Sequence, residues 1–225
     1  MAKQSNNQKK RAITIITILR TATKDMVEPA GITIIKQFGR NPYLVLVSCI
    51  LSLRTKDTVS LPASQRLFAL AQTPSALLSL TPKTIQDLIY PVGFYRQKTK
   101  QLLKISSILQ KQYNSAVPNT EKDLLALPGV GPKTTNLVLS LGFNIPALCV
   151  DTHVHRISNH LGLVNTETPE ETEAQLKLIL PKEYWSEFNE LMVMWGQNIC
   201  VPISPFCSKC PLLPLCPQNG VNKRR

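Results

Sequence analysis

The chain has 225 residues, and 43% of them are hydrophobic, which is enough for a packed core and excludes a disordered protein. Lysine and arginine number 26 against 14 aspartates and glutamates, so the net charge of +12 favours a polyanionic partner, usually a nucleic acid. No apolar stretch reaches the length of about 18 residues that a membrane-spanning helix needs.

The N-terminal segment MAKQSNNQKKRAITIITILR is basic and contains a short apolar run. Thr14 and Thr17 interrupt that run, and no small-residue cleavage site follows it, so the segment does not fit a signal or transit peptide. We expect a disordered basic arm that leads into a first helix. We also expect an intracellular protein, located in the cytoplasm or nucleoid if the source is prokaryotic.

Helical signals dominate the rest of the chain. Residues 96–113 place apolar side chains on one face and lysines, including Lys98, mostly on the other, which predicts an amphipathic helix with a cationic side. We expect Lys98 on this side to contact DNA. The apolar run at 43–53 exceeds a typical strand and has no partner strand, so it predicts a buried central helix. The predicted fold class is all-α. Three pairs place a capping residue before a proline at the first helical position: Thr81–Pro82, Gly131–Pro132 and Thr168–Pro169.

The segment TEKDLLALPGVGPKTTNLVLSLG, residues 120–142, predicts two short helices joined by a tight hairpin. Pro128 ends the first helix and Pro132 begins the second. The glycines of PGVG let the backbone turn and approach a partner without a Cβ atom, and N–H groups at the second helix can hold a phosphate. Together with the positive charge, this helix-hairpin-helix signature favours a grip on the DNA backbone over a purely structural turn. The expected DNA contacts here are Leu127, Gly129, Val130, Gly131 and Thr134.

Lys133 is the second residue of the predicted second helix. The positive end of the helix dipole disfavours an ammonium there, and partial burial against the hairpin would act in the same direction. A lysine that loses its proton easily can form a Schiff base with a carbon at the aldehyde oxidation level. A simple phosphate-binding cation is the alternative, and Lys133 alone does not decide between the two.

Asp151 lies in the motif VDTHVHR, residues 150–156, where it precedes a predicted helix. It can act as an N-cap, or as a carboxylate that accepts the Lys133 proton and stabilises positive charge on a sugar. His153 and His155 are two residues apart and do not share a helix face, which argues against a metal pair. We assign His153 to the DNA-facing site, as a packing or hydrogen-bonding residue.

Six cysteines occur, of which Cys49 and Cys149 lie in apolar runs and are predicted to be buried thiols. The other four have the spacing C-x6-C-x2-C-x5-C on a proline-rich loop: Cys200, Cys207, Cys210 and Cys216. An intracellular location argues against disulfides. Zinc sites generally show two Cys-x-x-Cys pairs and only one is present, so a [4Fe–4S] cluster is favoured over zinc, although both accept four thiolates.

The hairpin with Lys133, the motif VDTHV with Asp151 and the cysteine spacing, in this order, resemble the endonuclease III family of helix-hairpin-helix DNA glycosylases. The resemblance extends from KKRAITIITILR to Cys216. It implies that Lys133 is the nucleophile and Asp151 its essential carboxylate. The implied reaction flips a damaged pyrimidine out of double-stranded DNA, releases the base and cleaves the strand by β-elimination, with a monomer as the acting species.

The family resemblance also implies an architecture. Residues 35–146 would form a six-helix barrel, and residues 1–34 and 147–225 an iron-sulfur helical domain with the cluster loop at 200–216. A side chain must fill the gap left by the flipped base, and Phe94 in PVGFYRQK is the candidate for this wedge.

Two positions depart from the family pattern. The segment LS-x-Q often carries glutamine, where this chain has Arg54, so we expect Arg54 to contact DNA near the flipped base or its partner. The loop VPISPF between the first two cysteines has no basic residue, so any phosphate contact would shift to Lys209 and the tail NKRR.

Two alternative functions remain: a mismatch, uracil, thymine or adenine glycosylase of the same superfamily, and a non-enzymatic DNA-binding iron-sulfur protein.

Overall fold

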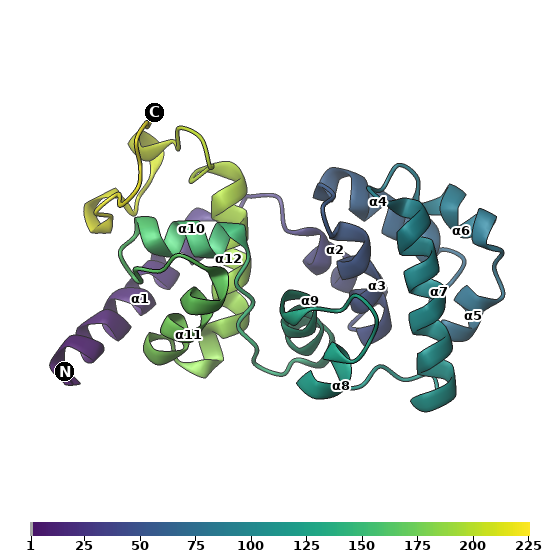
Figure 1. Ribbon diagram of the computed structural model, residues 1–225. Coiled ribbons are helices and arrows are strands. Elements are labelled where there is room, and N and C mark those ends of the chain that lie inside the picture. The colour runs from purple at the N-terminus through teal and green to yellow at the C-terminus, as the bar shows by residue number, and fades with distance from the viewer. Residues whose placement is uncertain (1) are drawn as a thin grey trace. The chain divides into compact units, whose positions relative to one another are not determined.

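The structure is a computed structural model that describes residues 2–225, with side chains from Asn7 onward (Figure 1). All regular elements of this described part are helical, which confirms the all-α prediction. The chain forms two compact units, one of Met1–Glu28 with Pro146–Arg225 and one of Pro29–Ile145. The predicted boundary after residue 34 falls inside helix α2 (Ala30–Phe38), which belongs entirely to the second unit.

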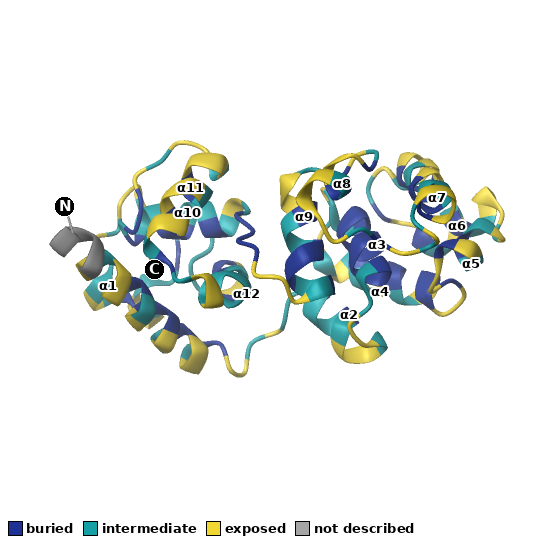
Figure 2. Ribbon diagram, turned by 90° about the horizontal axis from the view of Figure 1, so that it is seen from below, coloured by how far each residue is buried: buried dark blue, intermediate teal, exposed yellow. Residues whose placement is uncertain are grey.

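The second unit is built around α3 (Pro42–Ser52), the buried central helix that the apolar run predicts. Every side chain from Tyr43 to Leu51 is buried, as Figure 2 shows by colour. The Asn41 side chain caps this helix by accepting a hydrogen bond from the Tyr43 amide. Helices α2, α4 (Asp57–Phe68), α7 (Tyr95–Gln112) and α9 (Pro132–Leu137) pack against α3, together with a π-helical turn at Val138–Gly142.

Helix α6 (Pro82–Ile89) of this unit begins where its capping pair predicts. Thr81 caps α6 with Pro82 at the first position, and its hydroxyl accepts from the Thr84 amide at 3.1 Å. The remaining helices of this unit are α5 Pro74–Leu78 and α8 Glu121–Leu125.

The other unit consists of α1 (Ala2–Ala22) and three C-terminal helices around a shared core, in which Ile15, Ile16 and Leu19 are fully buried. The three helices are α10 Thr152–His160, α11 Pro169–Ile179 and α12 Trp185–Asn198. The expected irregular basic arm is wrong for the described residues, because α1 already begins at Ala2. Lysine, glutamine and alanine favour helix, and neither proline nor glycine interrupts this segment.

Arg11 on α1 ties this helix to the C-terminal part of the unit. Its guanidinium donates to the backbone oxygens of Leu161, Gly162 and Leu215. In the part of the chain that the structure describes, no helix is both long and apolar enough to cross a bilayer.

Lys98 on α7 is a cation inside the second unit, with 5% of its surface exposed. Its ammonium donates to the backbone oxygens of Leu51 (2.9 Å) and Leu53 (2.6 Å) and to the Thr55 hydroxyl (3.2 Å). These acceptors lie at the C-terminal end of α3 and in the following loop, where helical carbonyls lack partners within the helix. Burial lowers the pKa of Lys98 to about 8, because uncharged acceptors do not fully replace the lost water.

We predict that Lys98 makes the stability of the chain depend on alkaline pH. The unfolded chain keeps the Lys98 proton up to its ordinary pKa of 10.5, whereas the folded chain releases it from about pH 8. Between these values the unfolded state binds more protons, so the free energy of unfolding rises with pH, by an amount on the order of 1–3 kcal/mol. Denaturant titrations of the wild type and Lys98→Met at about pH 8 and about pH 10 measure this rise. Equal pH dependence in the two proteins would contradict the prediction.

Candidate functional site

The predicted hairpin is present between α8 and α9. Thr120 caps α8, its hydroxyl accepting from the Asp123 amide at 3.2 Å, and α9 begins at Pro132 as expected. Gly129 has φ +70, a conformation that favours glycine, and it is exposed at the turn. The Val130 amide donates to the Leu127 carbonyl at 3.1 Å and closes the turn.

The five hairpin residues predicted to contact DNA differ in what they expose. Leu127, Val130 and Thr134 have buried side chains, with 2%, 6% and 2% of their surface exposed. These three side chains lie in the interior of the second unit. Any contact with a phosphate would therefore come from the backbone of the turn, where Gly129 and Gly131 are more accessible.

Gln101 on α7 holds the hairpin turn, a role that sequence reasoning missed. Its side-chain amide donates to the Pro128 carbonyl at 2.9 Å. A Cβ atom on Gly129 would collide with this amide, so the glycine also serves the packing of the turn against α7. A polar residue on a helix surface carries no signal of such a contact, because its partner lies in a distant segment.

Lys133 is the second residue of α9 and is exposed, whereas we expected partial burial against the hairpin. The outward face of this short helix starts at Pro132, and the inward face carries buried Thr134 and Thr135. The lysine lies near Cys49 on α3. Burial raises the pKa of the Cys49 thiol to about 12, and the positive charge of Lys133 opposes that rise.

Asp57 is a second charged residue near Cys49 that sequence reasoning did not single out. Its negative charge adds to the raised pKa of the Cys49 thiol, although burial is the larger cause. Its carboxylate accepts a hydrogen bond from the Ala30 amide at 3.2 Å, which joins α4 to the start of α2. The sequence places Asp57 directly after the LSLRTK segment, but this position did not identify it, because acidic residues are common in the first turn of a helix.

Asp151 is the N-cap of α10, the role that its position before the helix predicts. One carboxylate oxygen accepts from the amides of His153 (2.9 Å) and Val154 (3.0 Å). The residue is partly exposed and belongs to the unit formed by the chain ends, whereas Lys133 belongs to the other unit. The N-cap hydrogen bonds fix the direction of the carboxylate.

His153 packs on α12, where a Cβ atom at Gly196 would collide with its ring. Arg156 lies beside it and also bonds to the start of the cysteine loop. Its guanidinium makes a 3.2 Å hydrogen bond with His153 Nδ1 and donates to the Cys200 carbonyl at 2.5 Å. Arg156 therefore links the helix that Asp151 caps to the first of the four cysteines.

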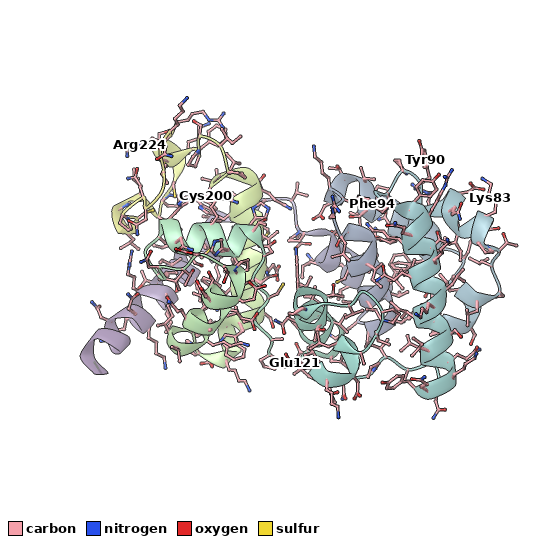
Figure 3. All side chains as sticks on the ribbon, viewed as in Figure 1. Lys83, Tyr90, Phe94, Glu121, Cys200 and Arg224 are labelled. Atoms are coloured by element: carbon pink, nitrogen blue, oxygen red, sulfur yellow. The ribbon has the colours of Figure 1, made fainter. Side chains whose placement is uncertain are left out.

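Arg54 and Phe94 lie together, although they are far apart in the sequence. The Arg54 guanidinium is 4.6 Å from the centre of the Phe94 ring. Both side chains are at the surface, and Phe94 is 50% exposed at the start of α7 (Figure 3). A planar cation stacked on an aromatic ring is a favourable pair, and it remains accessible to a partner here.

The structure corrects the interpretation of Lys98 as a DNA contact. The side chain lies in the interior, where its three donors serve the loop after α3. We grouped Lys98 with the lysines off the apolar stripe, but it lies four residues before Leu102, on the buried face of α7. The carbonyls at the end of α3 accept hydrogen bonds from it there.

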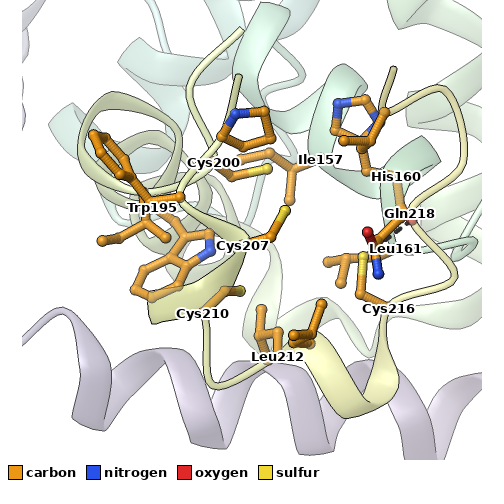
Figure 4. Close-up of a pocket in the computed structure, with 15 residues that line it drawn as sticks. Ile157, His160, Leu161, Trp195, Cys200, Cys207, Cys210, Leu212, Cys216 and Gln218 are labelled. Atoms are coloured by element: carbon orange, nitrogen blue, oxygen red, sulfur yellow. Dashed lines mark hydrogen bonds between the residues drawn. The ribbon is translucent and has the colours of Figure 1, made fainter. Parts of the chain in front are cut away.

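The four C-terminal cysteines line one pocket in the unit formed by the chain ends: Cys200, Cys207, Cys210 and Cys216 (Figure 4). The pocket has about 420 Å³ of empty volume, partly open to solvent, and Trp195 and Leu212 contribute apolar walls. Within the described residues, no three cysteine, histidine, aspartate or glutamate side chains are arranged to hold one metal ion. The thiols instead surround the pocket from several sides.

The pocket disfavours four free thiolates. The pKa of Cys200 is raised to about 12, mainly by burial; the Arg156 charge opposes this rise and repulsion from the other three thiols contributes to it. Burial likewise raises the pKa of Cys210 and Cys216. A positively charged metal group would remove this penalty, so the donor set fits a thiolate-bound cofactor.

The C-terminal residues lie along the uncharged loop 201–206. The Arg225 amide donates to the Pro205 carbonyl at 2.8 Å, and its guanidinium lies 3.8 Å from the centre of the Phe206 ring. Lys209 is exposed beside the same ring. The cations that we expect to replace the missing charge of this loop thus lie next to it, and their contact with DNA stays a prediction.

Comparison with known proteins identifies the family. Residues 47–182 match the HhH-GPD superfamily of base excision DNA repair proteins. The chain is 48% identical to endonuclease III of Thermotoga maritima over 190 residues, which cover 82% of this chain and 89% of the relative. A non-covalent endonuclease III–DNA complex is similar with a TM-score of 0.82 and 33% identity over 93% of this chain and 95% of that one. A trapped covalent endonuclease III–DNA intermediate has a TM-score of 0.80 and 32% identity over 93% and 96% of the two chains. Because these similarities extend along most of the sequence and of the fold, the chain belongs to the endonuclease III family of HhH-GPD base excision DNA repair proteins.

Proposed function

We propose that the chain is a bifunctional DNA glycosylase and abasic-site lyase that removes oxidised pyrimidines from double-stranded DNA as a monomer. The observation that carries this proposal is the exposed primary amine of Lys133 directly after the hairpin turn. The chain belongs to a family in which endonuclease III has been trapped covalently on DNA. An amine nucleophile that forms a Schiff base accounts for both base removal and strand cleavage.

The chemistry starts when neutral Lys133 Nζ attacks C1′ of the flipped nucleoside. The glycosidic bond breaks, and the base leaves with the bonding electrons and takes up a proton. Opening of the sugar ring gives a protonated Schiff base between Nζ and C1′. Loss of a C2′ proton then expels the 3′ phosphate, which cleaves the strand, and water releases the lysine.

Asp151 is proposed to accept the Lys133 proton and to stabilise positive charge that develops on the sugar. Its two N-cap hydrogen bonds keep the carboxylate oriented. The backbone at Gly129 and Gly131 is proposed to bind the DNA phosphates, which anchors the hairpin beside Lys133.

We infer that a [4Fe–4S] cluster is bound by Cys200, Cys207, Cys210 and Cys216. A pocket lined by four thiols and apolar side chains supports this assignment, as does membership of the endonuclease III family. When bound, the cluster would supply four metal–thiolate bonds that tie the loop 200–216 together. We assign it no step in the reaction.

Borohydride trapping on a duplex with one abasic site tests the nucleophile. The wild type is expected to give a covalent protein–DNA product, and Lys133→Ala is expected to reduce its formation by about 10³-fold or more, because the attacking amine is gone. Lys111→Ala removes an exposed lysine at the end of α7 and serves as the matched control.

Trapping that persists in Lys133→Ala would refute the mechanism. The same assay on duplexes with an oxidised pyrimidine, uracil or a mismatched base determines the substrate. Activity confined to the mismatched bases would replace the proposed substrate with the alternative glycosylase class.

Asp151→Asn separates the charge of this residue from its capping role. Asparagine caps helices as well as aspartate, so the melting temperature is expected to stay nearly unchanged. The rate of base removal is expected to fall by about 10²-fold, because the proton acceptor and the negative charge are lost. Single-turnover kinetics and thermal unfolding measure the two effects. A variant of normal rate would exclude the catalytic role of the carboxylate.

Metal analysis of the purified chain tests the cofactor. We expect about four irons per chain with visible absorption, and loss of both in Cys216→Ser, because that cysteine is a proposed ligand. Cys149→Ser changes a buried cysteine outside the pocket and is expected to keep the iron. A colourless protein that contains zinc and no iron would overturn the assignment.

A further inference from the structure

We propose that Lys98 is a positioning residue that holds Arg54 and Phe94 together as one rigid element for insertion into the base stack of damaged DNA. The inference rests on the proposed function, since it assigns a role in that reaction to a buried side chain that makes no contact with the reacting atoms. In this role Lys98 acts through the two surface residues.

The two surface residues sit on separate loops in unfavourable backbone conformations. Arg54, in the loop after α3, has φ 54, and Phe94, directly before α7, has φ 58. Side chains other than glycine rarely adopt this left-handed region, and such conformations persist where the surrounding structure holds them. The two loops therefore need an external constraint.

Lys98 supplies that constraint from one turn into α7. Its backbone amide donates to the Phe94 carbonyl at 3.0 Å. Its ammonium donates to the residues on either side of Arg54, to the Leu53 carbonyl at 2.6 Å and the Thr55 hydroxyl at 3.2 Å. One residue is thus bonded to Phe94 itself and to both neighbours of Arg54.

A second contact brings the two loops together. The Gly93 amide donates to the same Thr55 hydroxyl at 3.2 Å. A Cβ atom at Gly93 would lie 3.1 Å from the Arg54 carbonyl oxygen and 3.2 Å from the Thr55 hydroxyl, so a larger residue there would crowd the contact between the loops. The Thr55 hydroxyl therefore joins Lys98, the Arg54 loop and the Phe94 loop.

The assembled element suits a gap in a base stack. The Arg54 guanidinium lies 4.6 Å from the Phe94 ring centre, and half of the Phe94 surface is exposed. Tyr90 is 60% exposed in the same loop. Aromatic rings stack on bases of any sequence, and a guanidinium adds attraction to the strand, so this chemistry recognises an unstacked duplex.

The experiment compares the full chain with Lys98→Met, which fills a similar volume without donors. Lys100→Met makes the same substitution on an exposed lysine of α7 and is the matched control. Each protein is assayed for cleavage of an abasic site in duplex DNA and in a single strand. Insertion into the base stack is monitored by the fluorescence of a 2-aminopurine base placed next to a non-cleavable tetrahydrofuran site in a duplex.

Lys98→Met is expected to lower kcat/KM on the duplex by about tenfold or more, because a small misplacement of a positioned group has a large kinetic effect. It is expected to lose the fluorescence change and to cleave the single strand within about twofold of wild type, since a single strand has no stack to fill. In a Phe94→Ala background, Lys98→Met is expected to lower kcat/KM on the duplex by less than about a further twofold, because the inserting element is already lost.

Two hydroxyl variants keep the test decisive if Lys98→Met fails to fold. Thr55→Val removes the shared acceptor at nearly constant shape and is expected to reproduce the duplex defect, whereas Thr55→Ser is expected to retain activity. Equal loss on duplex and single strand, or an unchanged duplex rate and fluorescence response, would overturn the positioning role. If the wild type cleaves the abasic site in neither the duplex nor the single strand, the proposed function itself is refuted.

Discussion

The burial of α3 is the constraint on which the second unit depends. A helix with nine consecutive buried positions, Tyr43–Leu51, must be covered on all sides, and the surrounding helices provide that cover. The helix α9 that carries Lys133 is one of them, so the hairpin is set against α3 by core packing. The same helix ends in carbonyls without helical partners, and one of them accepts from Lys98. The packing around α3 thus positions the hairpin, and the unpaired carbonyls at its end position the Arg54 loop through Lys98.

Several basic side chains bind the protein backbone, although the charge of +12 favours a polyanion as partner. Lys98 donates to carbonyls at the end of α3, Arg11 to three backbone oxygens of the C-terminal region, and Arg156 to the Cys200 carbonyl. Each supplies hydrogen-bond donors where irregular backbone would otherwise leave acceptors unsatisfied. Net charge therefore indicates the class of partner without identifying which cations face it.

The proposed chemistry is divided between two kinds of local structure. Lys133 is exposed at the start of a short helix, where a glycine turn brings the backbone to the surface. Asp151 is held by two amides as an N-cap, which fixes its direction. The same α10 helix is bonded through Arg156 to the loop whose four thiols line the pocket. Metal binding in that loop would therefore stabilise the helix that orients the carboxylate.

Features that depend on neighbouring residues could be predicted from the sequence alone. The buried helix over 43–53, the caps before Pro82 and Pro169, the hairpin around Gly129 and the cysteine spacing all arise within one turn, one helix or one loop. Their signals are local because caps, glycine conformations and hydrophobic periodicity act over a few residues. Family membership followed from the order of these local motifs.

Only the tertiary structure decided which polar residues face inward and which distant residues meet. Helical spacing places Lys98 on the buried face of α7, four residues before Leu102, but only the packing of α7 against α3 supplies the carbonyls that accept hydrogen bonds from a lysine there. Gln101 meets the hairpin turn, and Arg54 meets Phe94, across segments that periodicity cannot relate. The physical reason is that a hydrogen-bond donor or a ring is matched to its partner by the packing of whole helices, and one sequence window does not contain that packing.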